Sequence, residues 1–229
     1  MSKIIAGIGD LRSNQSQVFG IGRTRMNLAV HHMMGAALFA KRVREIEVQN
    51  KEQRFGDFFS EIIWHSSATT LLAVAAIEAY INEIFLDAKT NFPVDVAQIV
   101  AEQWAQIERT PTLKKYHKAL RLKGAKAMEG SPAYQEMDNL IKARNALTHF
   151  QPQWQDEETS HREVEQRLKG KFPTSPFMDS GSTFFPNQCM TYGFTKWAVE
   201  TAMTFSNEFS IRFAITNKFL KFKDMIELT

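Results

Sequence analysis

Hydrophobic residues recur at helical spacing through most of the chain. The stretch from Met26 to about Gln49 places apolar side chains near helical spacing, which predicts a first helix. A second run begins at Gly56 or Asp57 and contains no proline before Pro93, so it predicts a helix of more than about thirty residues. The apolar positions of the first run are Leu28, Val30, Met34, Leu38, Phe39 and Val43.

Several shorter helices are predicted downstream. One follows Pro93 and ends at the Arg-Thr-Pro of residues 109–111, and another covers 113–122. Ser131 followed by Pro132 is a typical helix start, and this helix is expected to stop at Pro152. Residues 1–24 predict an irregular arm and 153–187 a long connection with a brief helix at 161–169. An aromatic-rich helix is predicted over 190–222.

The fold class that follows is all-α. No two-residue alternation bounded by turns and no hairpin signal occurs in the sequence. With 229 residues, of which 44% are hydrophobic, the chain can bury one sizeable core. We therefore expect residues 1–229 to form a single helical bundle with additional N- and C-terminal helices.

Composition restricts the chemistry more than it identifies it. The net charge of +3 is compatible with an anionic partner without requiring one. The single cysteine, Cys189, excludes an intrachain disulfide and a cysteine-based zinc site, which together with the absence of an export signal favours a cytoplasmic protein. Ile62–Ile77, the longest uncharged stretch, is too short to span a bilayer. Phosphate-binding glycine loops, metalloprotease motifs and metal-ligand spacings are missing, so no cofactor and no metal are expected.

Two charged residues occupy positions where leucine is expected. At about 100° per residue, Arg144 falls on the same helix face as Met137, Leu140 and Leu147, and Glu78 falls near the centre of the apolar stripe of the long second helix. Because an isolated buried charge costs several kcal/mol, we expect Arg144 and Glu78 to pair. A purely structural ion pair is the alternative explanation for both residues.

The residues after Arg144 suggest chemistry. Asn145 and His149 are four apart on one helix face, where the amide can hydrogen-bond the imidazole, and a histidine at a helix end suits proton transfer near neutral pH. A surface or capping role for His149 stays open. Arg144 and His149 diverge by about 140° on a continuous helix, so one chain cannot aim both at one small group. Two chains about a two-fold axis can, which predicts a homodimer.

The string Arg144-Asn145-Ala146-Leu147-Thr148-His149 resembles the R-N-x-x-x-H motif of HEPN-domain ribonucleases, and residues 76–85 resemble the acidic second helix of several bacterial HEPN families. The resemblance implies an all-α dimer that cleaves single-stranded RNA without metal by attack of the ribose 2′-hydroxyl. It implies that His149 transfers the proton, Arg144 holds the phosphate, Asn145 orients His149 or touches the phosphate, and Glu78 fixes Arg144. Arg25 with His31 also has an arginine–histidine spacing, but Met26 replaces the polar second residue.

RNA is therefore the expected partner. Residues 112–126 carry many lysines and an arginine with Tyr116 and His117 among them, which is typical of an RNA-binding surface and equally of a solvated amphipathic helix. The resemblance suggests the toxin of a toxin–antitoxin pair, with an antitoxin as a second partner, or an effector of antiviral defence. The alternative is a catalytically inactive HEPN-like module that binds RNA or a protein partner.

Overall fold

The computed structural model describes residues 25–152 and 161–228. Within these ranges the chain forms helices and short helical turns and no strand, so the all-α prediction is confirmed. The elements are α2 (Ala29–Gln49), α3 (Phe58–Leu86), α4 (Ala88–Asn91), α5 (Val94–Glu102), α6 (Trp104–Glu108), α7 (Thr112–Lys123), α8 (Pro132–Thr148), α9 (Arg162–Leu168), η1 (Phe184–Gln188), α10 (Tyr192–Phe213), η2 (Lys218–Phe222) and α11 (Lys223–Ile226).

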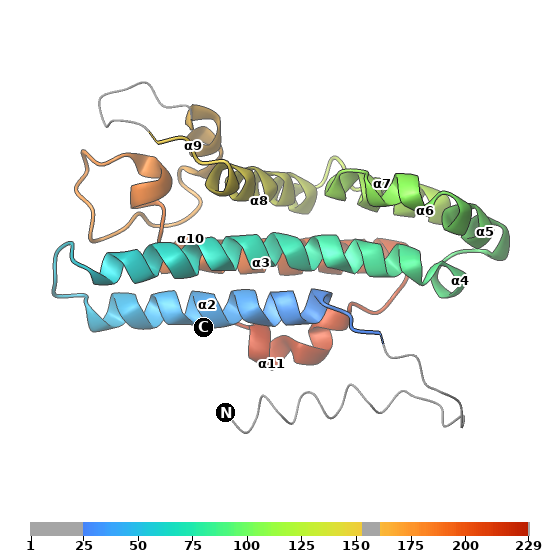
Figure 1. Cartoon of the computed structure of the whole chain (residues 1–229), viewed down its shortest axis with the longest axis horizontal. Helices are drawn as coiled ribbons and strands as arrows, with labels where there is room; N and C mark the ends of the chain where they lie inside the picture. Colours follow the sequence, from blue (N-terminus) through green and yellow to red (C-terminus); the bar gives the residue numbers. More distant parts are fainter. Residues whose placement is uncertain (1–24, 153–160, 229) are drawn as a thin grey trace.

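Three long helices make the body of the molecule. α2 and α3 lie side by side and antiparallel, and α10 packs against both (Figure 1). Small buried side chains permit this close approach, among them Ala36 and Ala40 of α2 and Ala73 and Ala76 of α3. Gly35 lies at the same contact, where a Cβ would come within 3.1 Å of Leu72 Cδ1. Small residues at helix contacts let apolar surface be buried without voids.

Aromatic side chains of α10 fill the centre of the bundle. Phe205, Phe209 and Phe213 are completely buried, as the sequence suggests for this helix. The ring of Tyr116, from α7, packs edge-on against Phe205 at 4.7 Å and Phe209 at 4.6 Å between centroids. Its hydroxyl donates a 2.8 Å hydrogen bond to the carbonyl of Ile77, so α7 is joined to α3 and α10 through one side chain.

Three observed helix ends come before the predicted ones, and the largest difference is in the C-terminal helix. The second helix has 29 residues and stops at Leu86, where Asp87 leaves the helical conformation. The C-terminal helix stops at Phe213 instead of 222, because Ala214 adopts the left-handed conformation with φ 58° and closes the helix. Helix α8 ends at Thr148, before Pro152. The brief helix predicted at 161–169 is present as α9, whereas the predicted arm of residues 1–24 lies outside the described residues.

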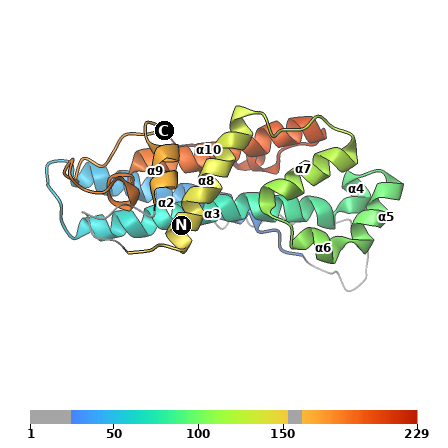
Figure 2. The same ribbon diagram turned by 90° about the horizontal axis from the view of Figure 1, so that it is seen from above.

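Helix α8 carries the predicted site and is firmly held. The Ser131 hydroxyl accepts a hydrogen bond from the amide of Tyr134 and Pro132 is its first residue, as predicted for this helix start. α8 crosses obliquely above α3 and α10 (Figure 2). The carboxylate of Glu136 accepts from the indole of Trp197 at 3.0 Å and pairs with Lys171 at 2.5 Å, which fixes α8 to α10 and to the segment after α9.

One described helix, α3, is long and apolar enough to cross a membrane by length and composition. Its most apolar window is 61% buried by neighbouring protein. The helix also carries the buried polar residues Thr69, Tyr80 and Glu83, each hydrogen-bonded inside the bundle. We therefore interpret α3 as the core helix of this bundle, and the cytoplasmic localisation stays a prediction.

Candidate functional site

The predicted site residues gather at the C-terminal end of α8 and on the facing part of α3. The buried face of α8 consists of Ala133, Met137, Leu140 and Ala143. Arg144 is the next residue along, so it lies at the edge of this face and is half-buried instead of central. Asn145 and His149 are exposed. The sequence placed the helix correctly and overestimated the burial of its arginine.

Arg144 and Glu78 line one pocket of about 510 Å³ between α3, α8 and the chain from Glu108 to Lys114. Among the described residues no ion pair or hydrogen bond joins them, so the predicted Arg144–Glu78 contact is wrong in this structure. The Nε of Arg144 is buried and has no hydrogen-bond partner. A buried, unpaired guanidinium donor costs about 1–3 kcal/mol, and an anion entering the pocket would supply the missing acceptor.

The buried carboxylate of α3 is Glu83 instead of Glu78. Its side chain is 8% exposed, pairs with Lys218 at the C-terminal end of the chain and accepts a 3.1 Å hydrogen bond from the amide of Ala29. Glu83 thereby caps α2 and joins both ends of the described chain to α3. Five residues separate Glu78 and Glu83, so they point in different directions, and Glu78 faces the pocket while Glu83 faces the core.

His149 lines a second pocket, of about 320 Å³, on the other side of Asn145. His149 follows the last residue of α8, and its amide donates a 2.9 Å hydrogen bond to the carbonyl of Asn145. Among the described residues no hydrogen bond joins the Asn145 amide to the imidazole. Asn145 lines both pockets, whereas Arg144 lines only the first and His149 only the second of these two. Within one chain the guanidinium and the imidazole therefore serve neighbouring but separate cavities.

A second histidine, His161, lines the pocket of His149, and sequence reasoning missed it. It is 7% exposed, and its Nε2 lies 3.2 Å from the carbonyl oxygen of Gln151. Its ring stacks on Phe150 at 4.9 Å with an interplanar angle of 10° and also contacts Phe185 at 5.2 Å. His149 and His161 are twelve positions apart and do not share a helix, so no helical spacing relates them, and only the folded chain brings them together.

Charged residues form a network at the rim of this second pocket. Lys142 pairs with Asp138 at 2.9 Å and with Glu163 at 3.6 Å, and Arg167 pairs with Glu163 at 3.0 Å. These side chains are about one-third exposed or more, so each pair contributes little to stability. Their effect is to hold α9 against α8 and to leave a lysine beside His149.

The basic segment 112–126 provides less RNA-binding surface than predicted. Tyr116 is core, and Lys115 is 1% exposed with its Nζ donating to Asn82 Oδ1 at 2.7 Å. Burial lowers the pKa of Lys115, although Glu78 and Glu108 oppose the shift. His117 lies against the carboxylate of Glu129. The interleaved aromatic residue therefore cannot stack on a base, and Lys114 is the basic residue of this segment that lines the Arg144 pocket.

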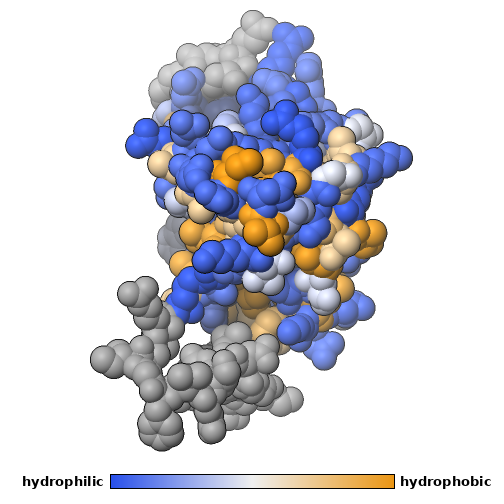
Figure 3. Space-filling model, turned by 90° about the vertical axis from the view of Figure 1, so that its right-hand side faces the viewer, coloured by the Kyte–Doolittle hydropathy of each residue, from blue (hydrophilic) through white to orange (hydrophobic). Residues whose placement is uncertain are grey.

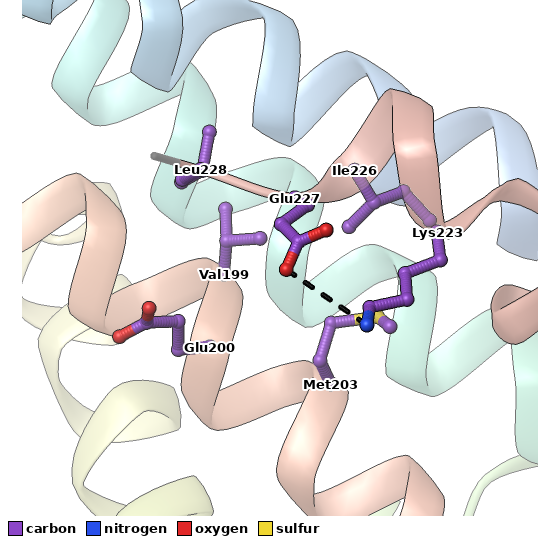
Figure 4. Close-up of a pocket in the computed structure, with 7 residues that line it drawn as sticks. All are labelled: Val199, Glu200, Met203, Lys223, Ile226, Glu227 and Leu228. Carbon is purple, nitrogen blue, oxygen red and sulfur yellow. Dashed lines mark ion pairs between the residues drawn. The ribbon is translucent and has the colours of Figure 1, made fainter.

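Two further surface features lie away from these residues. The end formed by α4, α5 and α6 exposes Leu86, Val94 and Ile99, and Figure 3, which faces that end, shows apolar side chains amid a hydrophilic surface. A cavity of about 200 Å³ lies between α10 and α11, lined by Val199, Met203 and Ile226 with the Lys223–Glu227 pair at its edge (Figure 4). Neither feature contains a residue of the predicted site.

The described residues contain no group of three or more His, Cys, Asp or Glu side chains placed to hold a metal ion. Cys189 is buried, and burial raises the pKa of its thiol, so it is not a nucleophile. The candidate chemistry therefore consists of a guanidinium, an amide and an imidazole. Comparison of the chain with protein-family models, with curated proteins and with solved structures finds no match.

Proposed function

We propose that this chain is a metal-independent endoribonuclease of HEPN type that cleaves single-stranded RNA. The observation that carries the proposal is the arrangement at the end of α8. Arg144 has a buried donor without a partner, Asn145 and His149 are exposed, and Asn145 lines both of the pockets that the other two residues serve.

The reaction follows from the chemistry of the groups. His149 takes the proton of a ribose 2′-hydroxyl, the 2′-oxygen attacks the adjacent phosphorus, and the bond from phosphorus to the 5′-oxygen breaks. The protonated imidazole gives this proton to the leaving 5′-oxygen, which returns His149 to its neutral form. The products are a 2′,3′-cyclic phosphate and a free 5′-hydroxyl. Arg144 pairs with the phosphate oxygens as negative charge grows on them, and Asn145 touches the phosphate from between the pockets. Glu78 lines the same pocket without contacting Arg144 and has no step in this reaction.

The active form that we propose is a homodimer. Because Arg144 and His149 line different pockets in one chain, a second chain related by a two-fold axis supplies the partner group for each. Helix α3 offers an apolar stripe for this contact, with Trp64 65% exposed and Leu71 41% exposed. Leu71 lies two helical turns before Glu78 on the same face, so the stripe leads directly to the Arg144 pocket.

The direct test is RNA cleavage in the presence of a chelator. Purified protein is incubated with single-stranded RNA, and the wild type is compared with Arg144→Ala and His149→Ala. Chelator-resistant cleavage that leaves cyclic phosphate ends and is lost in both variants supports the proposal. Equal cleavage by all three proteins would show that the activity arises elsewhere.

Mixing the two inactive variants tests the shared site. In a random mixture half of the dimers contain one chain of each variant. Each of these mixed dimers has one site with an intact arginine and an intact histidine, whereas a wild-type dimer has two such sites. About a quarter of wild-type activity should therefore return. A site contained in one chain would regain no activity.

A substitution at the proposed dimer contact tests the assembly directly. Leu71→Glu should weaken the dimer and lower activity together, whereas Ile211→Glu, at a position 71% exposed on α10, is the matched control.

The separation of Arg144 from His149 also supports an alternative, an inactive HEPN-like module that binds RNA or a protein. Binding without cleavage in the chelator assay would establish this alternative.

The biological setting that we propose is a toxin controlled by an antitoxin, or an effector of antiviral defence. Growth arrest on expression of the wild type, relieved by His149→Ala, tests that setting.

A further inference from the structure

Phe150 follows His149 directly and is an exposed aromatic ring with a fixed backing. One face of the ring is covered by the parallel imidazole of His161, at 4.9 Å and 10°. The residue is nevertheless 42% exposed, so its free surface is the opposite face and the ring edge. An isolated surface phenylalanine would rotate freely, whereas this one is held in a single plane.

The backing itself is rigid. His161 is 7% exposed, lies within hydrogen-bond distance of the Gln151 carbonyl and also contacts the ring of Phe185, which is tilted by 56°. Phe185 belongs to the core cluster that also contains Ala143 of α8. The stack therefore runs from the core, through His161, to the exposed ring of Phe150, and it ends next to the imidazole that we propose as the proton carrier.

We propose that Phe150 is a stacking platform for a base of single-stranded RNA, adjacent to the phosphate that His149 and Arg144 act on. The inference rests on the proposed function. A base laid on the outer face of Phe150 is held beside the His149 pocket, which His161 also lines. Stacking is tolerant of sequence because each base has a flat face, so the platform selects unpaired RNA over duplex without selecting one base.

Binding is measured with 2′-O-methyl oligonucleotides, which cannot be cleaved, by fluorescence anisotropy. Phe150→Ala should weaken binding about 5- to 150-fold and Phe150→Trp should preserve it, since base–aromatic stacking contributes about 1–3 kcal/mol per base. Phe55→Ala is the matched control, because Phe55 is 64% exposed at the turn before α3. His161→Leu, which removes the flat backing while filling the space, should give an intermediate loss.

A set of oligonucleotides that each lack one base identifies the contact. For one abasic position, Phe150→Ala should cause no further loss, because the stacked base is already missing. The inference is overturned when Phe150→Ala binds like the wild type, or when it weakens every abasic oligonucleotide to the same extent. Cleavage is measured in parallel. Binding that depends on Phe150 without any cleavage would reject the nuclease proposal and support the stacking platform. Cleavage that does not depend on Phe150 would support the nuclease proposal and reject the platform.

Discussion

Replacement of Arg144 by methionine separates a structural arginine from a functional one. The methionine keeps the apolar stem and removes the guanidinium, whose Nε is buried without a partner and which forms no ion pair among the described residues. Removing an unsatisfied donor recovers about 1–3 kcal/mol of desolvation, and the shorter side chain loses some packing. The free energy of unfolding should therefore change by less than about 1 kcal/mol, or rise. For a chain of this size, that is a shift of less than about 4 °C in Tm.

Glu83→Ala supplies the contrasting case. It removes the partner of Lys218 and leaves the amide of Ala29 without its acceptor. Because Lys218 keeps partial access to solvent, the expected loss is about 3 kcal/mol, the lower end of the range for breaking buried pairs. Tm should fall by about 6–12 °C. Thermal unfolding followed by circular dichroism measures both variants. A loss at Arg144→Met as large as that at Glu83→Ala would refute the reasoning, since Arg144 would then be a structural residue.

Three further predictions concern the fold. Ala214→Gly should stabilise the chain by about 1 kcal/mol, because Ala214 has φ 58°, and a lower Tm in thermal melts would contradict this reason. Gly193→Ala should destabilise it by about 1–3 kcal/mol, since the new Cβ would lie 2.9 Å from Pro173 Cδ; Gly130→Ala, where the Cβ meets nothing within 4 Å, is the control for urea unfolding. Burial raises the pKa of the Glu47 carboxyl, which accepts a 2.7 Å hydrogen bond from the amide of Tyr192. The stabilisation that Glu47 gives is therefore fully present below the pKa that it has in the unfolded chain. It is lost as the pH rises through the pKa that Glu47 has in the folded protein. Glu47→Gln avoids this loss, and its Tm relative to wild type should increase between pH 4 and pH 7.

The sequence predicted the helices because their signals are local. Apolar spacing defines α2 and α3, and the Ser131–Pro132 pair defines the start of α8. The end of the last helix was wrong for a physical reason. The apolar pattern continues through Phe219, but Ala214 takes a left-handed conformation that no propensity favours in alanine, and Asn217 starts a new turn by accepting from the amide of Phe219. Tertiary packing of η2 and α11 against α2 determines that break.

The candidate site shows the same division between local and long-range information. Arg144, Asn145 and His149 are neighbours on one helix, so their motif is visible in the sequence. The narrow apolar stripe through Ile77 and Ile81 predicts that Glu78 is the buried carboxylate of α3. The burial of Glu83 could have been predicted only if the buried face of α3 had been known to be wider than this stripe. His161 has no local signal, because its place in the pocket depends on contacts with Phe150 and Phe185 that helical spacing does not predict.

These differences bear on how the two charges that interrupt apolar helix faces are used. A buried carboxylate needs partners to offset its desolvation, and Glu83 has two of them, Lys218 and the amide of Ala29. Arg144 has none within the described residues and lies where a pocket of about 510 Å³ gives access to solvent. A charge that stabilises the fold is expected to be paired in the free protein. A charge that binds a ligand is expected to lack a partner until the ligand binds. By this criterion Glu83 is structural, and Arg144 is placed to meet an anion that enters the pocket from solution.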